Sequence, residues 1–457
     1  MRYNYYNRFC KIVFAIVLGL PFIGFAQVEK ISYMRPSYWR PYDQTGINVF
    51  ETTKQADPVS FDGLRVRFGA GFTQQYQNLK HTNATALNNE GAAGNRLYPI
   101  TPGFMTSQAN LFMDVQLADG IRLNVTSYMS ARHHNETWVK GGFIQIDKFP
   151  FKGKFWDEIS KLTTVKIGHM EINYGDAHYR RSDGGQTLYN PFMDNNIMDE
   201  FATEIGGEVY VQKNGLAGMI GVTNGMIKGN VDSAYKTPQD DNTHKSPSIY
   251  GKLAYDKKLT DNVRLRVSGS YYYNKSAAGG LTIFGGDRTG SNYQNVMEKG
   301  APGALPASTA IAFSGRFNPG FSKKLNAYML NAFAKVYGFE LFGTYEGAKG
   351  RTKTETTDRK AKQYSIDGVY RFGKSESLFL GLRYNRVKAT LANTSAITYY
   401  TGDVTVNRFA FAGGWFLTKN LLLKGEVVNQ FYRNFPAEDY RSGGHFKGYV
   451  IEATVGF

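Results

Sequence analysis

The stretch Gly448-Tyr-Val-Ile-Glu-Ala-Thr-Val-Gly-Phe457, at the end of the sequence, decides the fold. Every second residue counted back from Phe457 is apolar or aromatic, whereas the residues between them are mostly small or polar. Side chains alternate between the two faces of a β-strand, so this pattern predicts a strand with one apolar face. A strand in this place needs a partner for its free edge, and the first strand of a closed barrel can supply one. We therefore expect a closed β-barrel.

The same alternation recurs along the chain. In the stretch 64–73, for example, the apolar Val66 and Phe68 alternate with Arg65 and Arg67. We expect sixteen such strands, an even number that brings both ends of the barrel to one side; fourteen or eighteen stay open because strand boundaries are hard to place. The expected strands span about 64–73, 110–117, 121–126, 139–148, 163–175, 202–213, 216–225, 247–257, 262–274, 325–336, 338–349, 361–373, 377–389, 403–417, 421–433 and 445–457.

The connections between these strands alternate in length. Short turns on one rim and long loops on the other are typical of bacterial outer-membrane barrels. One connection on the short side, 149–162, is longer, and its segment 156–161 could form a helical turn. Residues 307–317 also alternate, but an extra strand would break the even count, so we assign them to a loop. The long connections are about 79–105, 176–201, 226–246, 275–323, 350–360, 390–402 and 434–444.

A soluble β-sandwich would also alternate, so the pattern alone does not decide the class. Three features favour a membrane barrel: an export signal, strands of about 10–13 residues where soluble strands are more often about 5–6, and the terminal aromatic residue. The mean hydropathy of −0.39 excludes a helical membrane protein but suits strands that are apolar on one face only. The expected fold class is all-β: a transmembrane antiparallel β-barrel of about 16 strands, with short periplasmic turns and long extracellular loops.

The beginning of the chain has the parts of a secretory signal peptide. Three basic residues precede an apolar run over 12–23, and residues 24–26 form a small-x-small cleavage site. Cys10, the only cysteine, lies in this signal, so disulfides and cysteine-ligated metals are excluded from the exported chain. The segment after the signal is either an irregular leader or an arm that docks on a partner or folds up under the pore. The expected signal peptide, periplasmic N-terminal arm and outer-membrane barrel span 1–26, 27–63 and 64–457.

Two stretches resemble the phosphate-selective porin O/P family. Residues 166–175, Lys-Ile-Gly-His-Met-Glu-Ile-Asn-Tyr-Gly, are similar to a strand of that family before a long loop, and 204–225 resemble its next hairpin. The Gly-rich loops are also similar to porins of Bacteroidetes-type bacteria. The resemblance implies a 16-stranded barrel, commonly trimeric, with loops folded into the lumen; no lysine cluster for phosphate matches. The last strand resembles the assembly signal of outer-membrane barrels, carried here by Tyr449, Ile451, Val455 and Phe457.

The polar side of the expected strands is assigned to the lumen. It carries eleven basic and seven acidic positions, and this excess of four suggests a weak anion preference, because rings of fixed charge bias which ions enter a pore. The alternative is that the charges pair across neighbouring strands and only line a wet wall. The basic positions are Arg65, Arg67, Arg122, Lys252, Arg264, Arg266, Lys335, Arg371, Arg383, Arg408 and Lys424. The acidic positions are Asp114, Glu208, Glu340, Glu346, Asp367, Glu426 and Glu452.

The long loop 176–201 is expected to narrow the pore. It carries charges of both signs, which could set a transverse field if the loop folds inward; the alternative is a solvated external loop. The residues concerned are Arg180, Arg181, Asp183, Asp194, Asp199 and Glu200. A second long loop, 275–323, could narrow the mouth, cover it or contact a partner.

Together these features favour a porin of the bacterial outer membrane for the passive diffusion of small hydrophilic solutes, with no enzymatic activity, cofactor or metal. None of the seven histidines has a defensible catalytic or metal-ligand spacing. Two alternatives stay open: a non-catalytic barrel subunit of a larger outer-membrane complex, docked through the arm and long loops, and an outer-membrane hydrolase. The expected partners are outer-membrane lipid and lipopolysaccharide, the barrel assembly machinery, and a homotrimer or a hetero-complex. The positive charge is interleaved with acids and does not indicate nucleic acid.

Overall fold

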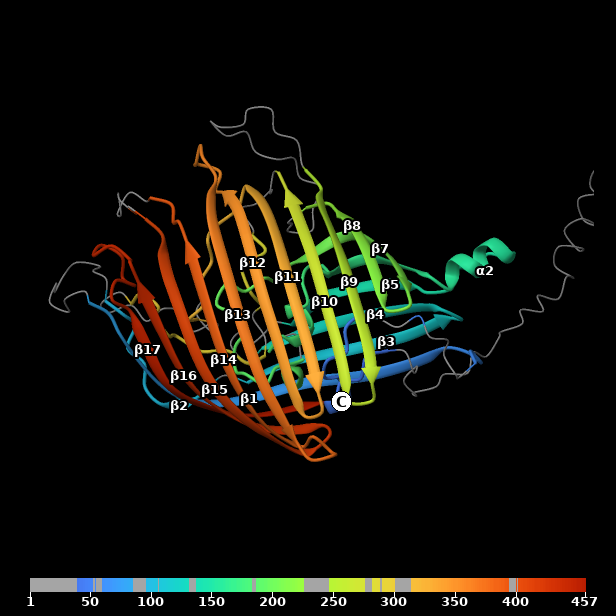
Figure 1. The fold of residues 1–457 in the computed structure, drawn as a ribbon, viewed down its shortest axis with the longest axis horizontal. Coiled ribbons are helices and arrows are strands. Elements are labelled where there is room, and N and C mark those ends of the chain that lie inside the picture. The colour runs from blue at the N-terminus through green and yellow to red at the C-terminus, as the bar shows by residue number, and fades with distance from the viewer. Residues whose placement is uncertain are drawn as a thin grey trace, which may run out of the picture.

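The strands of this protein form one antiparallel sheet that closes on itself into a barrel (Figure 1). The computed structural model describes residues 39–51, 54, 60–84, 96–105, 107–130, 137–182, 186–225, 246–275, 282–287, 290–300, 314–393, 400 and 402–457. The expected signal peptide lies outside the described residues.

Sixteen long strands follow one another around the barrel, and one two-residue strand, β2, is added to β1 through Tyr76 and Phe104. The predicted even number of strands and the all-β class are thus confirmed. Of the alternating stretch 307–317, the described part contributes one isolated bridge, between Tyr293 and Ser314. The strands are β1 (Arg65–Thr82), β2 (Gly103–Phe104), β3 (Gln108–Ala118), β4 (Ile121–Ser130), β5 (Thr137–Ile146), β6 (Thr163–Glu171), β7 (Thr203–Lys213), β8 (Leu216–Thr223), β9 (Ser248–Thr260), β10 (Val263–Asn274), β11 (Lys324–Val336), β12 (Phe339–Arg351), β13 (Arg359–Phe372), β14 (Leu378–Ala389), β15 (Val404–Thr418), β16 (Leu421–Arg433) and β17 (His445–Gly456).

Strand β1 is longer than predicted, because it continues to Thr82 instead of ending near residue 73. Its second half, 74–82, is mostly polar and shows no clear alternation. The backbone of this half nevertheless pairs with β17, from Gln74 opposite Ala453 onward. A strand can therefore extend on backbone hydrogen bonds to its neighbour where its side-chain pattern gives no sign of it.

The last strand closes the barrel against β1, as its pattern predicts. The Ala70 N–H donates to the Phe457 carbonyl at 3.0 Å, and the Phe457 N–H donates to the Ala70 carbonyl at 3.1 Å. Tyr449, Ile451 and Phe457 are exposed on the outer face, and Val455 is half-buried there. The role of these four side chains in assembly stays a prediction.

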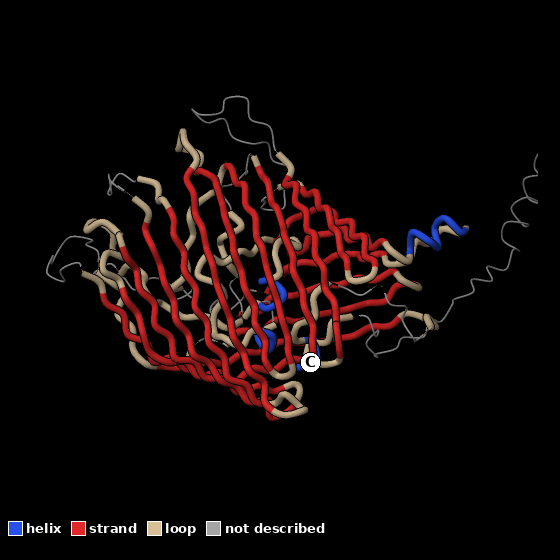
Figure 2. Tube along the Cα trace, in the orientation of Figure 1, coloured by secondary structure: helices blue, strands red, loops and turns tan. Residues whose placement is uncertain are grey.

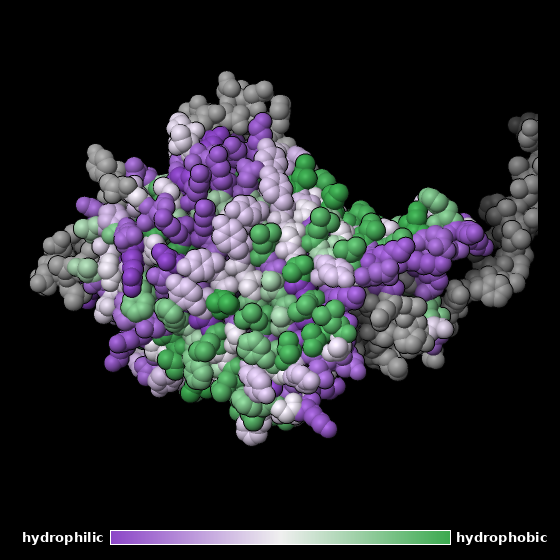
Figure 3. All heavy atoms as spheres, viewed as in Figure 1, coloured by the Kyte–Doolittle hydropathy of each residue, from purple (hydrophilic) through white to green (hydrophobic). Residues whose placement is uncertain are grey.

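Apolar side chains cover the outer face of the barrel. Leu253, Ile220 and Leu382, from three different strands, are 74 %, 66 % and 63 % exposed. Figure 3 shows hydrophobic residues gathering over the lower half of the facing wall, with hydrophilic residues toward the upper rim. An outward-facing apolar band is the surface that a barrel presents to lipid. None of the helices in the described ranges is long and apolar enough to cross a membrane.

Short turns lie on one rim of the barrel and long connections on the other, as predicted. Asn214 and Gly215 join β7 to β8 with φ angles of 52° and 86°, which suit a tight hairpin turn and which Asn and Gly adopt at low cost. The longer connection on the short-turn rim carries the predicted helical turn, which is α2 (Lys154–Ser160). The other short helices are η1 (Gln44–Gly46), η2 (Ala177–Arg180) and η3 (Thr187–Tyr189).

Three segments fold back into the barrel and fill much of its lumen. They are the arm segment (39–51), the inward loop (172–182 and 186–202) and the mouth loop (282–287, 290–300 and 314–323). Figure 2 shows loops and short helices between the barrel walls. Met193, Ile197 and Met198 of the inward loop are 0 % exposed. The lumen is therefore packed with protein along a large part of the wall.

Candidate functional site

The inward loop leaves the wall at the end of β6 and rejoins it at β7. The Ile172 N–H donates to the Ala202 carbonyl at 3.1 Å and closes the base of the loop. Gly175 has a φ of 72° and lies directly against the Met329 side chain of β11, which a Cβ atom at this position would displace. A glycine at this position lets the chain turn away from β6 and cross to the opposite wall.

The first anchor of the inward loop is Asp176. Arg266 of β10 donates two hydrogen bonds of 2.8 Å to its carboxylate, and the Lys252 Nζ atom of β9 lies 2.7 Å from it. Glu51 of the arm segment binds the same two cations, 3.0 Å from Lys252 and 2.8 Å from Arg266. All four side chains are almost fully buried. Charge-assisted contacts of this kind are strong away from water, so these wall cations hold the loop and the arm together.

The second anchor joins two aspartates of the inward loop to three arginines. Asp194 forms ion pairs with Arg316 of the mouth loop at 2.9 Å and with Arg408 of β15 at 3.1 Å. Asp199 forms ion pairs with Arg316 and with Arg181, both at 2.8 Å. Because every member is buried, losing one partner would leave a charge uncompensated. This network fixes the inward loop, the mouth loop and the wall relative to one another.

Wall side chains also hold the backbone of the inward loop. The Lys424 Nζ atom donates to the carbonyls of Asn190 and Phe192, both at 3.1 Å. Arg383 donates to the carbonyl of Asp194 at 2.7 Å. These contacts come from β16 and β14, so the loop is pressed against the side of the barrel formed by the later strands.

The eleven basic residues assigned to the lumen side all contact protein. Lys335 binds Glu376 of a short turn at 2.7 Å. Cross-strand pairing, the alternative that the sequence left open, describes five of the other ten. These pairs are Arg67–Asp114, Arg264–Asp256, Arg371–Glu340, Arg383–Asp367 and Lys424–Glu452. The others are Lys252, Arg266 and Arg408, which bind the inward loop, Arg65, which binds Asp62 and Gln116, and Arg122, which binds Asp147.

The residues predicted for a constriction lie inside the barrel, where they bind one another and the walls. Arg180 lies 3.7 Å from Glu340 of β12 and donates to Asn48 of the arm segment. Asp183 lies outside the described residues. The buried members are Arg180, Arg181, Asp194, Asp199 and Glu200.

The arm segment enters the lumen from the short-turn rim. The Gln44 N–H donates at 2.8 Å to the carbonyl of Lys419, which lies in the turn between β15 and β16. Deeper inside, the Tyr42 hydroxyl donates to Asp114 of β3 at 2.8 Å, and Asn48 donates to Glu340 at 2.7 Å. The described part of the arm therefore lies under the inward loop, inside the barrel.

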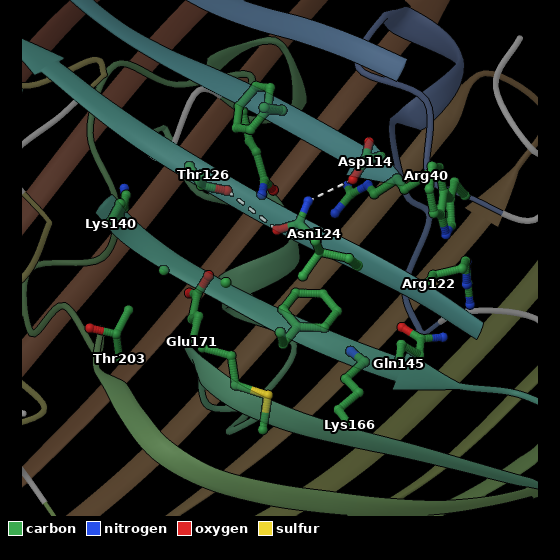
Figure 4. A pocket seen from close by; sticks show the side chains of 18 of the residues that line it. Arg40, Asp114, Arg122, Asn124, Thr126, Lys140, Gln145, Lys166, Glu171 and Thr203 are labelled. Carbon is green, nitrogen blue, oxygen red and sulfur yellow. Dashed lines mark hydrogen bonds between the residues drawn. The ribbon is translucent and has the colours of Figure 1, made fainter. Parts of the chain in front are cut away.

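A cavity of about 270 Å³ remains between this packed protein and the wall formed by β3 to β7. Arg122, Gln145 and Lys166 are register neighbours on β4, β5 and β6 and lie toward its short-turn end. Figure 4 shows them on one side of the cavity, with Lys140 and Thr203 on the other. The other lining residues include Trp39, Arg40, Tyr42, Arg67, Phe112, Phe143, Glu171, His178 and Tyr179. Two residues predicted to line the pore, Arg67 and Arg122, thus border open space.

From the sequence, three of the cations that line this cavity were not assigned to the lumen. Arg40 lies in the aperiodic arm segment, and Lys166 attracted notice only through the family resemblance. Lys140 is the extra residue of a bulge, because Thr126 pairs with Gly141 and the next pair skips one position on β5. Strict alternation along the strand assigns a bulged residue to the wrong face of the sheet. The signal for Lys166 was its position two residues after the polar Thr164.

Glu200 is a buried carboxyl group of the inward loop, and we expect it to make the docking of the loop depend on pH. Both of its carboxylate oxygens are buried with no hydrogen-bond donor among the described residues. Burial raises the pKa of Glu200, Glu346 and Asp199 add to the rise, and Arg181 opposes it. A carboxyl with a raised pKa stabilises the docked loop in its neutral form, and that contribution is lost as the pH rises through the raised pKa.

We expect Glu200→Gln to abolish this loss, because the amide stays neutral. Thermal unfolding of the refolded barrel, followed from neutral to alkaline pH, measures the effect. The wild-type protein should lose stability toward alkaline pH more steeply than the variant. Parallel curves for the two proteins would contradict the prediction.

Comparisons with known proteins bear on the barrel alone. No family model and no curated protein matches this chain. The solved anion-selective porin from Comamonas acidovorans is similar to it with a TM-score of 0.51 and 11 % identity, over 86 % of this chain and 100 % of that one. OprB of Pseudomonas putida is similar with a TM-score of 0.50 and 9 % identity, over 86 % and 94 %. The likeness shows the fold, which is that of the sixteen-stranded outer-membrane porins.

Proposed function

We propose that this protein is a channel of the bacterial outer membrane for the passive diffusion of small hydrophilic solutes. The observation that carries the proposal is the place of the cavity, which lies inside a barrel with an apolar outer face, along the wall that the inward loop leaves uncovered. Barrels of 16 strands are wide enough for an aqueous path beside a folded-in loop. Export by the signal peptide 1–26 and an arm 27–63 ahead of the barrel 64–457 belong to the same proposal.

The charges around the cavity support a weak anion preference. Among the described residues, no carboxylate lies within 4 Å of the charged nitrogen atoms of Arg40 or Lys166. The acidic Glu171, which also lines the cavity, lies 3.9 Å from His178. An uncompensated positive charge attracts anions into a narrow aqueous space. The remaining cations are neutralised in the pairs Arg67–Asp114, Arg122–Asp147 and Lys140–Asp287.

One observation favours a second function, that of a non-catalytic subunit in a larger outer-membrane complex. The lumen is packed by the arm segment, the inward loop and the mouth loop, so the open space is small for a barrel of this size. In that case the N-terminal arm and the long extracellular loops would provide the docking surfaces, and transport would be absent. The bilayer experiment below separates the two functions.

A hydrolase has less support. Three of the four described histidines bind groups that do not form a catalytic dyad: His81 binds the Tyr98 carbonyl, His178 binds Asn173 and His445 binds Asn429. The fourth, His169, lines the cavity. Within the described ranges no group of three His, Cys, Asp or Glu residues could hold a metal. We therefore propose a protein without catalytic activity.

The resemblance of 166–175 to the phosphate-selective porin family makes phosphate one of the anions to test. A homotrimer is part of the proposal, because the strands from β4 to β8 have 8 to 11 residues and those from β9 to β17 have 12 to 15. The wall formed by the shorter strands, β4 to β8, would then face a neighbouring subunit, and lipid and lipopolysaccharide would surround the rest of the barrel. The proposal also includes insertion by the barrel assembly machinery, since it places the barrel in the outer membrane.

We expect the refolded barrel to give steady ion currents in a planar bilayer. Under a KCl gradient, the reversal potential should have the sign of a channel that prefers chloride, because Arg40 and Lys166 face the cavity. A folded barrel that stays closed would contradict the channel and favour the complex subunit. A preference for potassium would contradict the anion preference alone.

A further inference from the structure

We propose that the cavity binds small organic carboxylates that carry one ring or a short apolar chain, and that Lys166 is the residue that binds the carboxylate. The proposal rests on the proposed channel function, since it names the class of solute that would use the same path. Three observations support it: the Lys166 ammonium has no hydrogen bond or ion pair among the described residues, a second positive charge lies at the same end of the cavity, and aromatic rings line the wall beside it.

The Lys166 side chain lines the cavity with its ammonium available to a ligand. Among the described residues, none forms a hydrogen bond or ion pair with it. Its register neighbour on β7, Glu208, is already bound by other donors: the Asn173 N–H at 2.9 Å, the Tyr250 hydroxyl at 3.0 Å and the Tyr210 hydroxyl. An ammonium has three donors and no acceptor, so an incoming carboxylate can bind it directly.

Lys166 and Arg40 lie at the same end of the cavity (Figure 4), which we call its positive end. Arg122 and Gln145, its register neighbours on β4 and β5, both bind Asp147 at the rim. Arg40 of the arm segment directs two donors to backbone carbonyls, and its positive charge has no ion pair among the described residues. The field at this end therefore favours a negatively charged group, while a single free ammonium suits a monoanion.

Apolar surface lies immediately beside the positive end. The Lys166 Nζ atom lies 5.2 Å from the ring centre of Phe143 and 5.1 Å from that of Tyr210. The rings of Tyr42 and Phe112, which also line the cavity, have their centres 4.4 Å apart and their planes tilted by 30°. A small dianion would lose hydration against these rings without recovering it, whereas an apolar body gains by contact with them.

The size of the cavity sets the size of the ligand. A cavity of about 150 Å³ accepts a benzene-sized molecule, so one of about 270 Å³ can hold a single ring together with its carboxylate. Gly141 and Gly142 of β5 contribute only backbone to this part of the lining. Benzoate is therefore a suitable probe, and acetate tests the carboxylate without the ring.

The test is calorimetric titration of the refolded full-length protein in detergent with benzoate, acetate and inorganic phosphate. We expect benzoate to bind more tightly than acetate, and Lys166→Gln to weaken benzoate binding about tenfold or more, because the ligand loses a charge-assisted contact. Lys166→Arg should restore most of the affinity. Lys258→Gln is the matched control, because Lys258 is exposed at the short-turn rim, paired with Asp261, and should bind benzoate like the wild type.

A second variant tests the aromatic wall. Phe143→Ala should weaken benzoate binding and leave acetate binding unchanged, since the ring contacts only the apolar body. Heat-modifiable migration on a gel verifies that each variant is folded. Benzoate binding that is absent, or equally strong in the Lys166→Gln variant, would overturn the proposal, and so would Lys166-dependent binding of phosphate without a preference for benzoate.

Failure of the channel is distinguishable from failure of the site. A barrel that binds benzoate through Lys166 but stays closed in a bilayer would contradict passage and retain the site. A barrel that conducts ions but does not bind benzoate would contradict the site and retain the channel.

Discussion

Asp194→Ala is expected to raise the single-channel conductance of the barrel severalfold. Asp194 is fully buried and forms ion pairs with Arg316 and Arg408, which would then lie buried without this carboxylate. Removing one partner of a buried ion pair typically costs about 3–5 kcal/mol. The barrel strands keep their own hydrogen bonds, so we expect the cost to fall on the docking of the inward loop, which would leave the wall and widen the path.

The matched control for this prediction is Asp358→Ala. Asp358 pairs with Lys324 of β11 and Arg351 of β12, and among the described residues its ion pairs do not involve the inward loop. Planar-bilayer recordings of both variants should show a higher conductance for Asp194→Ala alone. Equal conductance of wild type and Asp194→Ala, with both folded, would show that Lys424 and Arg383 hold the loop without the ion pairs.

Removal of the N-terminal arm through residue 51 is expected to raise the conductance as well and to weaken the anion preference. Trp39, Arg40 and Tyr42 line the cavity toward its short-turn end, so their loss opens that end. Arg40 also contributes positive charge to the cavity. Glu51 leaves with the arm, but Asp176 still binds both of its cations, so the inward loop keeps its first anchor.

The control for the arm is a shorter truncation that removes 27–38 and keeps the arm segment. Conductance and reversal potential of the two truncated proteins, recorded beside the full-length barrel, measure the effect. The short truncation should behave like the full-length protein. Unchanged conductance after the longer truncation would contradict a role of the arm segment in limiting the pore.

The alternation of side chains was sufficient to place the strands where each strand is regular. In β13, Tyr364 and Ile366 point outward between polar residues, and this strand was predicted within two residues of its observed ends. The prediction was less complete where backbone pairing or a bulge overrides the pattern. The second half of β1 extends along β17 without alternation, and the bulge at Lys140 changes which face its side chain occupies.

The candidate site was harder to predict than the fold. The inward charges of the wall were assigned correctly to the lumen side, but their partners come from distant parts of the chain. Asp176 lies 90 residues before Arg266, and Asp194 lies 122 residues before Arg316. No local pattern links residues so far apart, so the sequence could not show which cations contact protein and which face open space.

The sequence by itself thus determined the closed barrel, an even count of about sixteen strands, the apolar outer face and the division into short turns and long loops. These properties follow from a period of two and from turn length, which act within a few residues. Only the tertiary structure decided that most lumenal cations hold the inward loop and the arm, and that Lys166 and Arg40 remain beside the cavity. That outcome depends on which side chains meet across the lumen, because a buried charge is stabilised by partners close in space, wherever they stand in the chain.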